Sequence, residues 1–233
     1  MSAYLQYCGL DIGKKLIGPK RGNIKGHFED ELFVRFHKDV LKKNKQHMFL
    51  PEEIGFDEKD KSNARQLIDS QDKTSLWGWK DPRTIIFLYD WEAILGEKAK
   101  YIFIYRPPDQ VVDSLLRRNT DLILRFNPFI AAKSWLLYNQ RIVNFCRETG
   151  RNFALFNFDD ILKEPRHLVY FINKDELYQI NEKKIEEIYD SNLFKKNIGL
   201  WRSKLVNIIY RKQFNSLWSQ LEGLRIKNEN TLS

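Results

Sequence analysis

The chain has 233 residues, of which 42% are hydrophobic and 30% are charged, a composition that is typical of a globular protein and excludes a disordered one. The length fits a single domain, residues 1–233, with a large core. The formal net charge of +8 favours anionic ligands, but nucleic acid, anionic lipid, sulfated glycan and nucleotide all fit that charge.

Several other classes of protein are excluded. No apolar run approaches the length of about 20 residues that a membrane span needs, and the first residues lack the pattern of a signal peptide. The positive charge is scattered, which argues against a nucleic-acid partner. The two cysteines, Cys8 and Cys146, lie in apolar stretches, so we expect buried free thiols, a reducing cytoplasmic compartment and no metal site.

The first part of the chain is predicted to be mainly helical. Residues 2–8 form a helix that ends at Gly9, and residues 10–26 form a loop. Residues 28–43 have apolar side chains every four residues, which predicts an amphipathic helix with Glu29 and Asp30 in its first turn. Further along, the sequence predicts an irregular segment at 51–62, a short helix at 62–70, a strand at 76–79 and a helix at 84–95.

The second part alternates between strands and helices. Tyr101–Tyr105 is a continuous apolar run, which predicts a strand covered on both faces, and Pro108 suits the first turn of the next helix. We expect a long helix at 130–148 ended by Gly150, a strand at 153–158, a helix from near Ile161, and helices at 182–189 and 203–221.

This alternation predicts βαβ units and an α/β fold of three layers, α/β/α, around a central parallel sheet. Ligands of such sheets bind beyond the carboxyl ends of the strands. Lys80, Arg106 and Asp159 each follow a predicted strand, so we expect them to converge on one crevice.

Arg106 and Ser114 suit a phosphate site. A guanidinium at the end of a buried strand can bind phosphate through two parallel hydrogen bonds, and the Ser114 hydroxyl two helical turns on could face the same anion. Lys80 could neutralise charge on a transferring group. On spacing alone, a salt-bridged arginine, a surface serine and a lysine in an exposed turn explain the pattern as well.

Three stretches, taken in order and spacing, resemble the sulfotransferase family, whose donor is 3′-phosphoadenosine 5′-phosphosulfate (PAPS). They are residues 79–83 (Trp-Lys-Asp-Pro-Arg), 101–108 (Tyr-Ile-Phe-Ile-Tyr-Arg-Pro-Pro) and 114–118 (Ser-Leu-Leu-Arg-Arg). Residues 26–30 and 156–162 resemble family segments too, with Phe158 at a position where the family usually has Tyr. The resemblance is strongest over residues 2–166, and 167–233 is a helical C-terminal part.

The resemblance implies a P-loop NTPase-like fold with PAPS as donor and no metal. It implies that Arg106 and Ser114 bind the 3′-phosphate, that Lys80 stabilises the transferring group, and that His27 or Glu29 is the base. The acceptor would be a small molecule, a glycan or a lipid. A loop position for His27 and a role of Glu29 in stabilising a helix start stay open.

His37 is expected to pack in the core or lie on the surface, and four tryptophans either line the acceptor pocket or are core: Trp77, Trp79, Trp91 and Trp135.

One part of the family pattern is missing. Its Gly-rich loop after the first strand holds the 5′-phosphosulfate with backbone N–H groups, and residues 2–13 resemble the helix that follows this loop. We therefore expect the first strand and P-loop to be absent, the apolar face of Ala3, Leu5 and Cys8 to lack a partner, and solubility or stability to be low. A C-terminal Arg-Lys-Gly-x-x-Gly motif is not evident either.

These observations favour a sulfotransferase that transfers a sulfuryl group from PAPS to a hydroxyl or amine. Two alternatives stay open. One is a non-catalytic remnant that binds an anion or a nucleotide, which the missing loop favours. The other is a P-loop-type small-molecule kinase, which would need a Gly-x-x-x-x-Gly-Lys-(Ser/Thr) loop that the sequence lacks.

Overall fold

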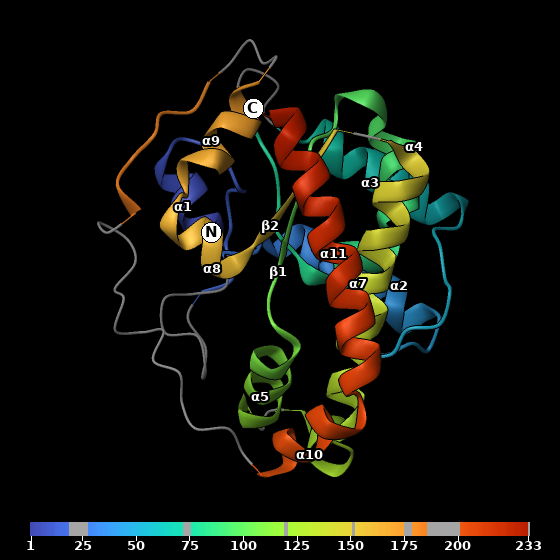
Figure 1. The fold of residues 1–233 in the computed structure, drawn as a ribbon. Helices are drawn as coiled ribbons and strands as arrows, with labels where there is room; N and C mark the ends of the chain where they lie inside the picture. The colour runs from blue at the N-terminus through green and yellow to red at the C-terminus, as the bar shows by residue number, and fades with distance from the viewer. Residues whose placement is uncertain are drawn as a thin grey trace. The chain divides into compact units, whose positions relative to one another are not determined.

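The computed structural model describes residues 1–18, 28–71, 76–118, 121–150, 152–174, 179–185 and 201–232 (Figure 1). Its contacts divide the chain into two units. Unit 1 comprises Met1–Gln46, Glu53–Ala99 and Ile161–Lys195, and unit 2 comprises His47–Glu52, Lys100–Asp160 and Lys196–Ser233. Each of these two units has buried apolar side chains of its own.

Unit 1 is built from helices. They are α1 (Ser2–Tyr7), α2 (Glu31–Lys43), α3 (Glu58–Asp69), the 3-10 helix η1 (Pro82–Phe87) continued by α4 (Leu88–Leu95), the short η2 (Gly96–Lys98) and α9 (Arg166–Asn173). The predicted helix at 28–43 begins late because Asp30 caps it. Its carboxylate accepts hydrogen bonds from the N–H groups of Leu32 and Phe33.

Two predictions for unit 1 are wrong. The irregular segment predicted at 51–62 already contains the start of α3, because Asp57 and Asp60 form a capping box there. The strand predicted at 76–79 is reduced to an isolated parallel bridge between Asp11 and Trp77, so this segment pairs with the N-terminal part of the chain.

The apolar side chains of α1 are covered, against the expectation that they would lack a partner. Ala3, Leu5 and Cys8 are all buried. The Cys8 carbonyl accepts a hydrogen bond from the N–H of Asn181, which joins the end of α1 to a later segment of unit 1. The exposed apolar face on which low stability was predicted is therefore not present.

Unit 2 contains a parallel βαβ arrangement. Strands β1 (Tyr101–Tyr105) and β2 (Phe153–Asn157) pair in parallel, with Tyr101 opposite Phe153 and Tyr105 opposite Asn157. Between them run α5 (Pro108–Arg118), α6 (Leu122–Phe126) and α7 (Phe129–Thr149), and α8 (Phe158–Lys163) follows β2 directly. The described residues thus form a mixed α/β protein that is mostly helical, with a two-stranded parallel sheet.

The C-terminal helices complete unit 2. They are α10 (Trp201–Ile209) and α11 (Arg211–Leu232), and α11 packs along α7 and β2 (Figure 1). The Tyr105 hydroxyl donates a 2.7 Å hydrogen bond to Glu222, which also accepts from Arg225. Burial, together with this bond to a carboxylate, raises the pKa of Tyr105. The helix predicted at 182–189 falls largely outside the described residues.

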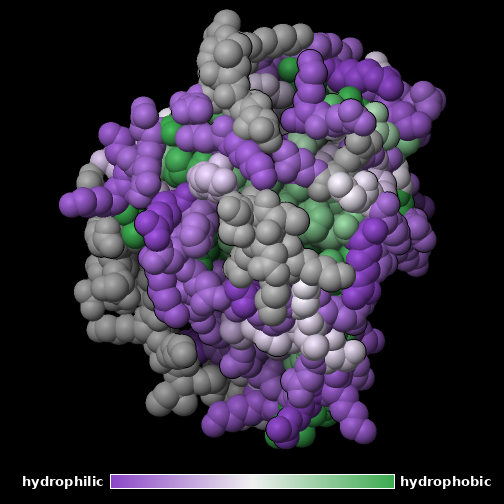
Figure 2. All heavy atoms as spheres, turned by 45° about the horizontal axis from the view of Figure 1, so that its top comes forward, coloured by the Kyte–Doolittle hydropathy of each residue, from purple (hydrophilic) through white to green (hydrophobic). Residues whose placement is uncertain are grey.

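Hydrophilic side chains cover most of the face drawn in Figure 2, and hydrophobic ones gather there in small patches. Within the described ranges, every helix is too short or too polar to cross a lipid bilayer.

The cap of α2 can be tested by substitution. Asp30→Ala should lower the free energy of unfolding by about 1–2 kcal/mol, because two backbone N–H groups at the helix start lose their acceptor. Asp30→Asn keeps an acceptor oxygen and should cost less than half of that. Urea denaturation followed by circular dichroism measures both, and equal losses in the two variants would show that the cap is not the cause.

Candidate functional site

The predicted site residues lie in both units. Glu29 and Lys80 belong to unit 1, whereas Arg106 and Ser114 belong to unit 2. His27 lies outside the described residues. Each unit contains one cluster of predicted site residues.

Glu29 and Lys80 form an ion pair in unit 1. The Lys80 ammonium donates to a Glu29 carboxylate oxygen at 2.5 Å, although the two residues are 51 positions apart in the sequence. The Glu29 side chain is only 8% exposed and that of Lys80 is 43% exposed. A ligand in solvent therefore meets the ammonium before it meets the carboxylate.

Arg83 and Asp81 extend this ion pair into a cluster of four charged side chains. The Arg83 guanidinium lies 2.5 Å from one Asp81 carboxylate oxygen and 4.0 Å from the second oxygen of Glu29. Two carboxylates and two cations thus alternate along the cluster, and their formal charges cancel. An anion can bind here only if a cation, most accessibly Lys80, exchanges its partner.

Asp81 is held by a buried histidine. His37 Nδ1 lies 2.8 Å from the second Asp81 oxygen, and the Trp91 indole N–H donates to His37 Nε2 at 2.8 Å. Because an indole can only donate, Nε2 must accept, which places the ring proton on Nδ1, where it is donated to Asp81. Sequence reasoning assigned His37 to packing or to the surface, and it is in fact a buried link of this network.

Burial disfavours the charged form of Asp81, but the hydrogen bond from His37 and the charge of Arg83 outweigh this effect, so that the pKa of Asp81 lies below its usual value. The carboxylate is therefore ionised at neutral pH. It also begins η1 by accepting from the Arg83 N–H. The turn that carries Lys80 is thus fixed by a buried charge.

Stacked rings surround this cluster. Phe33 on α2 stacks on Trp79 at 4.3 Å between ring centroids, and Trp91 lies 4.9 Å from Trp79. Trp91 is fully buried, as is nearly all of Trp135 in unit 2, so these two are core. Trp77 and Trp79 remain partly exposed and lie three positions and one position before Lys80 in the sequence.

The cluster in unit 2 is centred on Arg106. This residue directly follows β1, and its carbonyl accepts from the Trp135 indole at 3.1 Å. Its guanidinium donates to the Gln110 side chain at 3.0 Å and lies over the Phe158 ring, 4.6 Å from the centroid. Phe158 thus serves as a stacking platform for the guanidinium.

Ser114 lies on the helix face that the guanidinium reaches. Gln110 and Ser114 are four residues apart on α5, and residues at this spacing lie one above the other on the same face of a helix. In the described part of the chain, no hydrogen bond engages the Ser114 hydroxyl, and the side chain is half-buried. Arg106 and Ser114 are therefore arranged around the same stretch of α5.

The predicted convergence of Lys80, Arg106 and Asp159 is only partly seen. Arg106 and Asp159 follow the paired ends of β1 and β2, but Asp159 is exposed and its N–H is bonded to the Asn157 side chain. Lys80 follows the isolated bridge rather than a strand of the sheet. The third strand end was wrongly predicted because the run at 76–79 is too short to distinguish a sheet strand from a single bridge.

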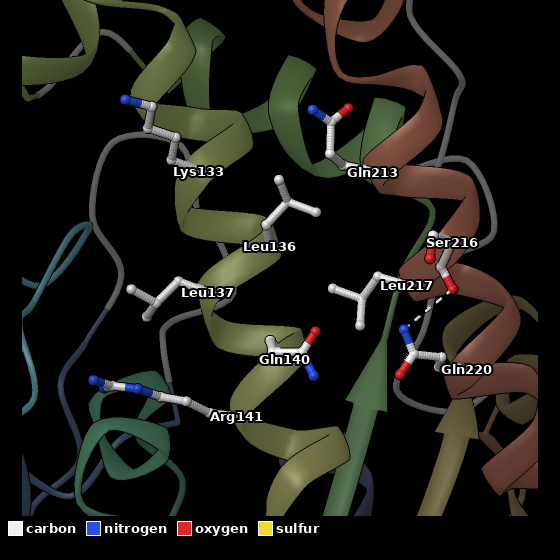
Figure 3. Close-up of a pocket in the computed structure, with 9 residues that line it drawn as sticks. All are labelled: Lys133, Leu136, Leu137, Gln140, Arg141, Gln213, Ser216, Leu217 and Gln220. Carbon is white, nitrogen blue, oxygen red and sulfur yellow. Dashed lines mark hydrogen bonds between the residues drawn. The ribbon is translucent and has the colours of Figure 1, made fainter.

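A groove lies elsewhere in unit 2, between α7 and α11, with a volume of about 580 Å³ (Figure 3). Leucines 136, 137 and 217 give it apolar walls, and Lys133 and Arg141 are the cations that line it. None of the predicted site residues lines this groove. Among the described residues, no three His, Cys, Asp or Glu side chains are grouped to hold a metal ion.

Local patterns in the sequence weakly indicate three residues of these clusters that were not predicted as site residues: His37, Asp81 and Gln110. His37 follows Phe33 by four positions on the apolar face of α2, which indicates a buried imidazole that needs polar partners. Asp81 precedes a proline at the start of η1, which is typical of a helix cap. Gln110 lay one turn before Ser114 and could have been identified as a neighbour by the same spacing.

Comparison with family models, with curated proteins and with solved structures finds no match to this chain.

The buried network makes a prediction about acid stability. Because the folded-state pKa of Asp81 is lowered below 3.8, its contribution to stability is complete above that pH and is lost as the pH falls through the folded-state pKa. Asp81→Asn should cost about 3 kcal/mol at neutral pH, since it removes one partner of a buried pair, and should flatten the acid dependence.

Asp159→Asn provides the control, because Asp159 is an exposed carboxylate and its substitution should change stability by less than about 0.5 kcal/mol. Thermal and urea unfolding between neutral pH and pH 2 measure both variants. An Asp81→Asn protein that is as stable as the unchanged chain at every pH would contradict this account of the network.

Proposed function

We propose that the chain is a PAPS-dependent sulfotransferase that transfers a sulfuryl group to a hydroxyl or an amine. The observation that carries the proposal is the position of Arg106, which leaves the end of a parallel strand and reaches the face of α5 on which Ser114 lies. A guanidinium and a hydroxyl in this arrangement suit a phosphate monoester, which offers several acceptor oxygens and up to two negative charges.

In this proposal the 3′-phosphate of PAPS replaces Gln110 as the partner of the guanidinium. Exchange of a neutral amide oxygen for a phosphate oxygen turns an ordinary hydrogen bond into a charge-assisted one, which is roughly twice as strong. The ring of Phe158 and the indole of Trp135 hold Arg106 from other sides, so the guanidinium can change its partner without losing its position.

The fold that we propose with this function is a three-layer α/β/α arrangement around a parallel sheet. The paired strands β1 and β2, with α5 and α7 between them in the sequence, support it as one parallel βαβ unit. The phosphate site then lies where such sheets bind ligands, at the carboxyl end of a strand.

Sulfuryl transfer needs an attacking atom, a departing phosphate and a proton acceptor. The acceptor oxygen or nitrogen forms a bond to sulfur while the bond from sulfur to the 5′-phosphate oxygen breaks, and the electron pair of that bond stays on the departing phosphate. By the resemblance, Lys80 would neutralise charge during transfer, and Glu29 or His27 would accept the proton. Without a ligand Lys80 and Glu29 neutralise each other, as their 2.5 Å contact illustrates.

The two free cysteines support a cytoplasmic location for this enzyme. Cys8 and Cys146 are both buried and unbridged. Burial raises the pKa of the Cys146 thiol to about 12, so this thiol stays protonated and unreactive at neutral pH.

Donor binding can be tested with adenosine 3′,5′-bisphosphate (PAP), the product that PAPS leaves. PAP should raise the melting temperature of the protein, and Arg106→Ala should weaken PAP binding by roughly 10- to 100-fold, since it removes a charge-assisted hydrogen bond. Ser114→Ala should weaken it by several-fold. Arg166→Ala is the matched control, because its exposed guanidinium pairs with Glu164 and belongs to unit 1, and it should bind PAP normally.

Two outcomes of the same titration decide against the proposal. Stabilisation by ATP with Mg²⁺ but not by PAP would indicate a kinase. Indifference to every nucleotide would leave a non-catalytic anion-binding protein.

The roles of Lys80 and Glu29 can be separated from binding. Lys80→Met and Glu29→Gln should each lower the transfer of labelled sulfuryl groups from PAPS to acceptors in a cell extract by about 100-fold or more, while PAP still raises the melting temperature. Lys59→Met, at an exposed position of α3, serves as the control and should transfer normally. Full transfer by the Lys80→Met protein would remove this lysine from the mechanism.

A further inference from the structure

Six large apolar side chains are exposed at one end of unit 2, and we call them the α6–α10 patch. Phe126 is 80% exposed, Trp201 73% and Ile208 71%, and these values are far above those of a packed side chain. The members of the patch are Leu122 and Phe126 on α6 and Trp201, Leu205, Ile208 and Ile209 on α10.

The two helices that carry the patch are linked by a hydrogen bond. The Arg202 guanidinium on α10 donates to the carbonyl of Arg125 on α6 at 2.7 Å, which joins the two elements. Both helices also contact α5, beside which α10 lies in Figure 1. Neighbouring apolar side chains of this size and exposure mark an interaction site rather than ordinary surface.

Helix α10 has its apolar stripe on the outside. At about 100° per residue, Trp201, Leu205 and Ile208 fall on one face, whereas the buried Ser203 and Val206 fall on the opposite face. The cations of this helix flank the outer stripe, with Arg202 on one side and Lys204 on the other. This is the arrangement of a helix that lies flat in a membrane interface, where long cationic side chains reach back to the headgroups.

The segments that carry and follow the patch are rich in cations. Residues 122–140 contain the cations Arg125 and Lys133, residues 201–221 contain Arg202, Lys204, Arg211 and Lys212, and neither stretch contains Asp or Glu. Two acids in the described part of this region are engaged, since Asp113 pairs with Arg117 and with the Ser203 hydroxyl, and Asp121 caps α6.

We propose that this end of unit 2 binds the surface of a membrane rich in anionic lipids, with the α6–α10 patch entering the interface and the surrounding cations facing the headgroups. Trp201 and Phe126 supply the aromatic groups that favour the boundary between headgroups and acyl chains, and the aliphatic members bury apolar surface there. An RNA would use the cations but would gain little from leucine and isoleucine, so the patch favours lipid.

Sedimentation with vesicles tests the proposal. The full chain should sediment with phosphatidylcholine vesicles that contain one third phosphatidylserine, should bind pure phosphatidylcholine vesicles far more weakly, and should be released as salt rises. The double substitution Phe126→Ser with Trp201→Ser should lower the partition coefficient on the order of tenfold or more. Both side chains are exposed, so circular dichroism and melting temperature should be unchanged.

Two controls distinguish binding through the patch from nonspecific hydrophobic binding and from nonspecific electrostatic attraction. Tyr170→Ser removes an exposed aromatic ring from α9 in unit 1 and should leave vesicle binding intact. Lys204→Gln with Lys212→Gln should weaken binding by several-fold to the anionic vesicles, whereas Lys59→Gln on α3 should not.

Three results would overturn the proposal. The first is vesicle binding that the double substitution leaves unchanged. The second is binding of a single-stranded RNA oligonucleotide in place of vesicles, which would make this end a nucleic-acid surface. The third is a dimer in analytical ultracentrifugation that the double substitution converts to a monomer, without vesicle binding, which would make the patch an interface between two copies of the chain.

Discussion

A buried carboxylate is tolerated in a protein only where donors and cations surround it, and Asp81 imposes this constraint on unit 1. It needs the imidazole of His37 from α2, which is in turn fixed by the indole of Trp91 from α4, and it needs the guanidinium of Arg83. The turn that carries Asp81 also carries Lys80. The placement of the ammonium beside Glu29 therefore depends on the same buried contacts that stabilise the fold, so the chemistry proposed for this pair rests on a rigid support.

The sequence predicted well those features that local chemistry determines. The strand at Tyr101–Tyr105, the proline that begins α5 and the glycine that ends α7 each depend on neighbouring residues, and all three were confirmed, although burial alternates along the strand and does not cover both of its faces equally. The strand at 76–79 was wrong because its partner is decided by a distant segment at Asp11. For the same reason, the sequence did not predict that Lys80 pairs with Glu29. Both residues were named as candidates, but no local pattern shows that positions 51 apart will meet.

The two units use charge in different ways. In unit 1 the cations near Glu29 and Asp81 are neutralised within the protein, which favours precise placement over attraction of ligands from a distance. In unit 2 the long acid-free segments leave cations that are not neutralised by neighbours along the sequence, so the positive potential of the chain concentrates there. The surplus of positive charge in the composition therefore lies mainly in unit 2, a location that the composition alone does not show.

Glu222 ties α11 to the last residues of both strands, because it accepts from the Tyr105 hydroxyl and lies within 3.5 Å of the Asn157 amide. The bonds from Tyr105 and Arg225 outweigh the effect of burial and lower the pKa of this carboxyl group, so it carries its charge at neutral pH. A late helix thereby stabilises the strand from which Arg106 emerges. Anyone who designs a shortened fragment of this chain for expression must retain the sequence through Arg225, since cutting earlier would leave the strand ends without their anionic anchor.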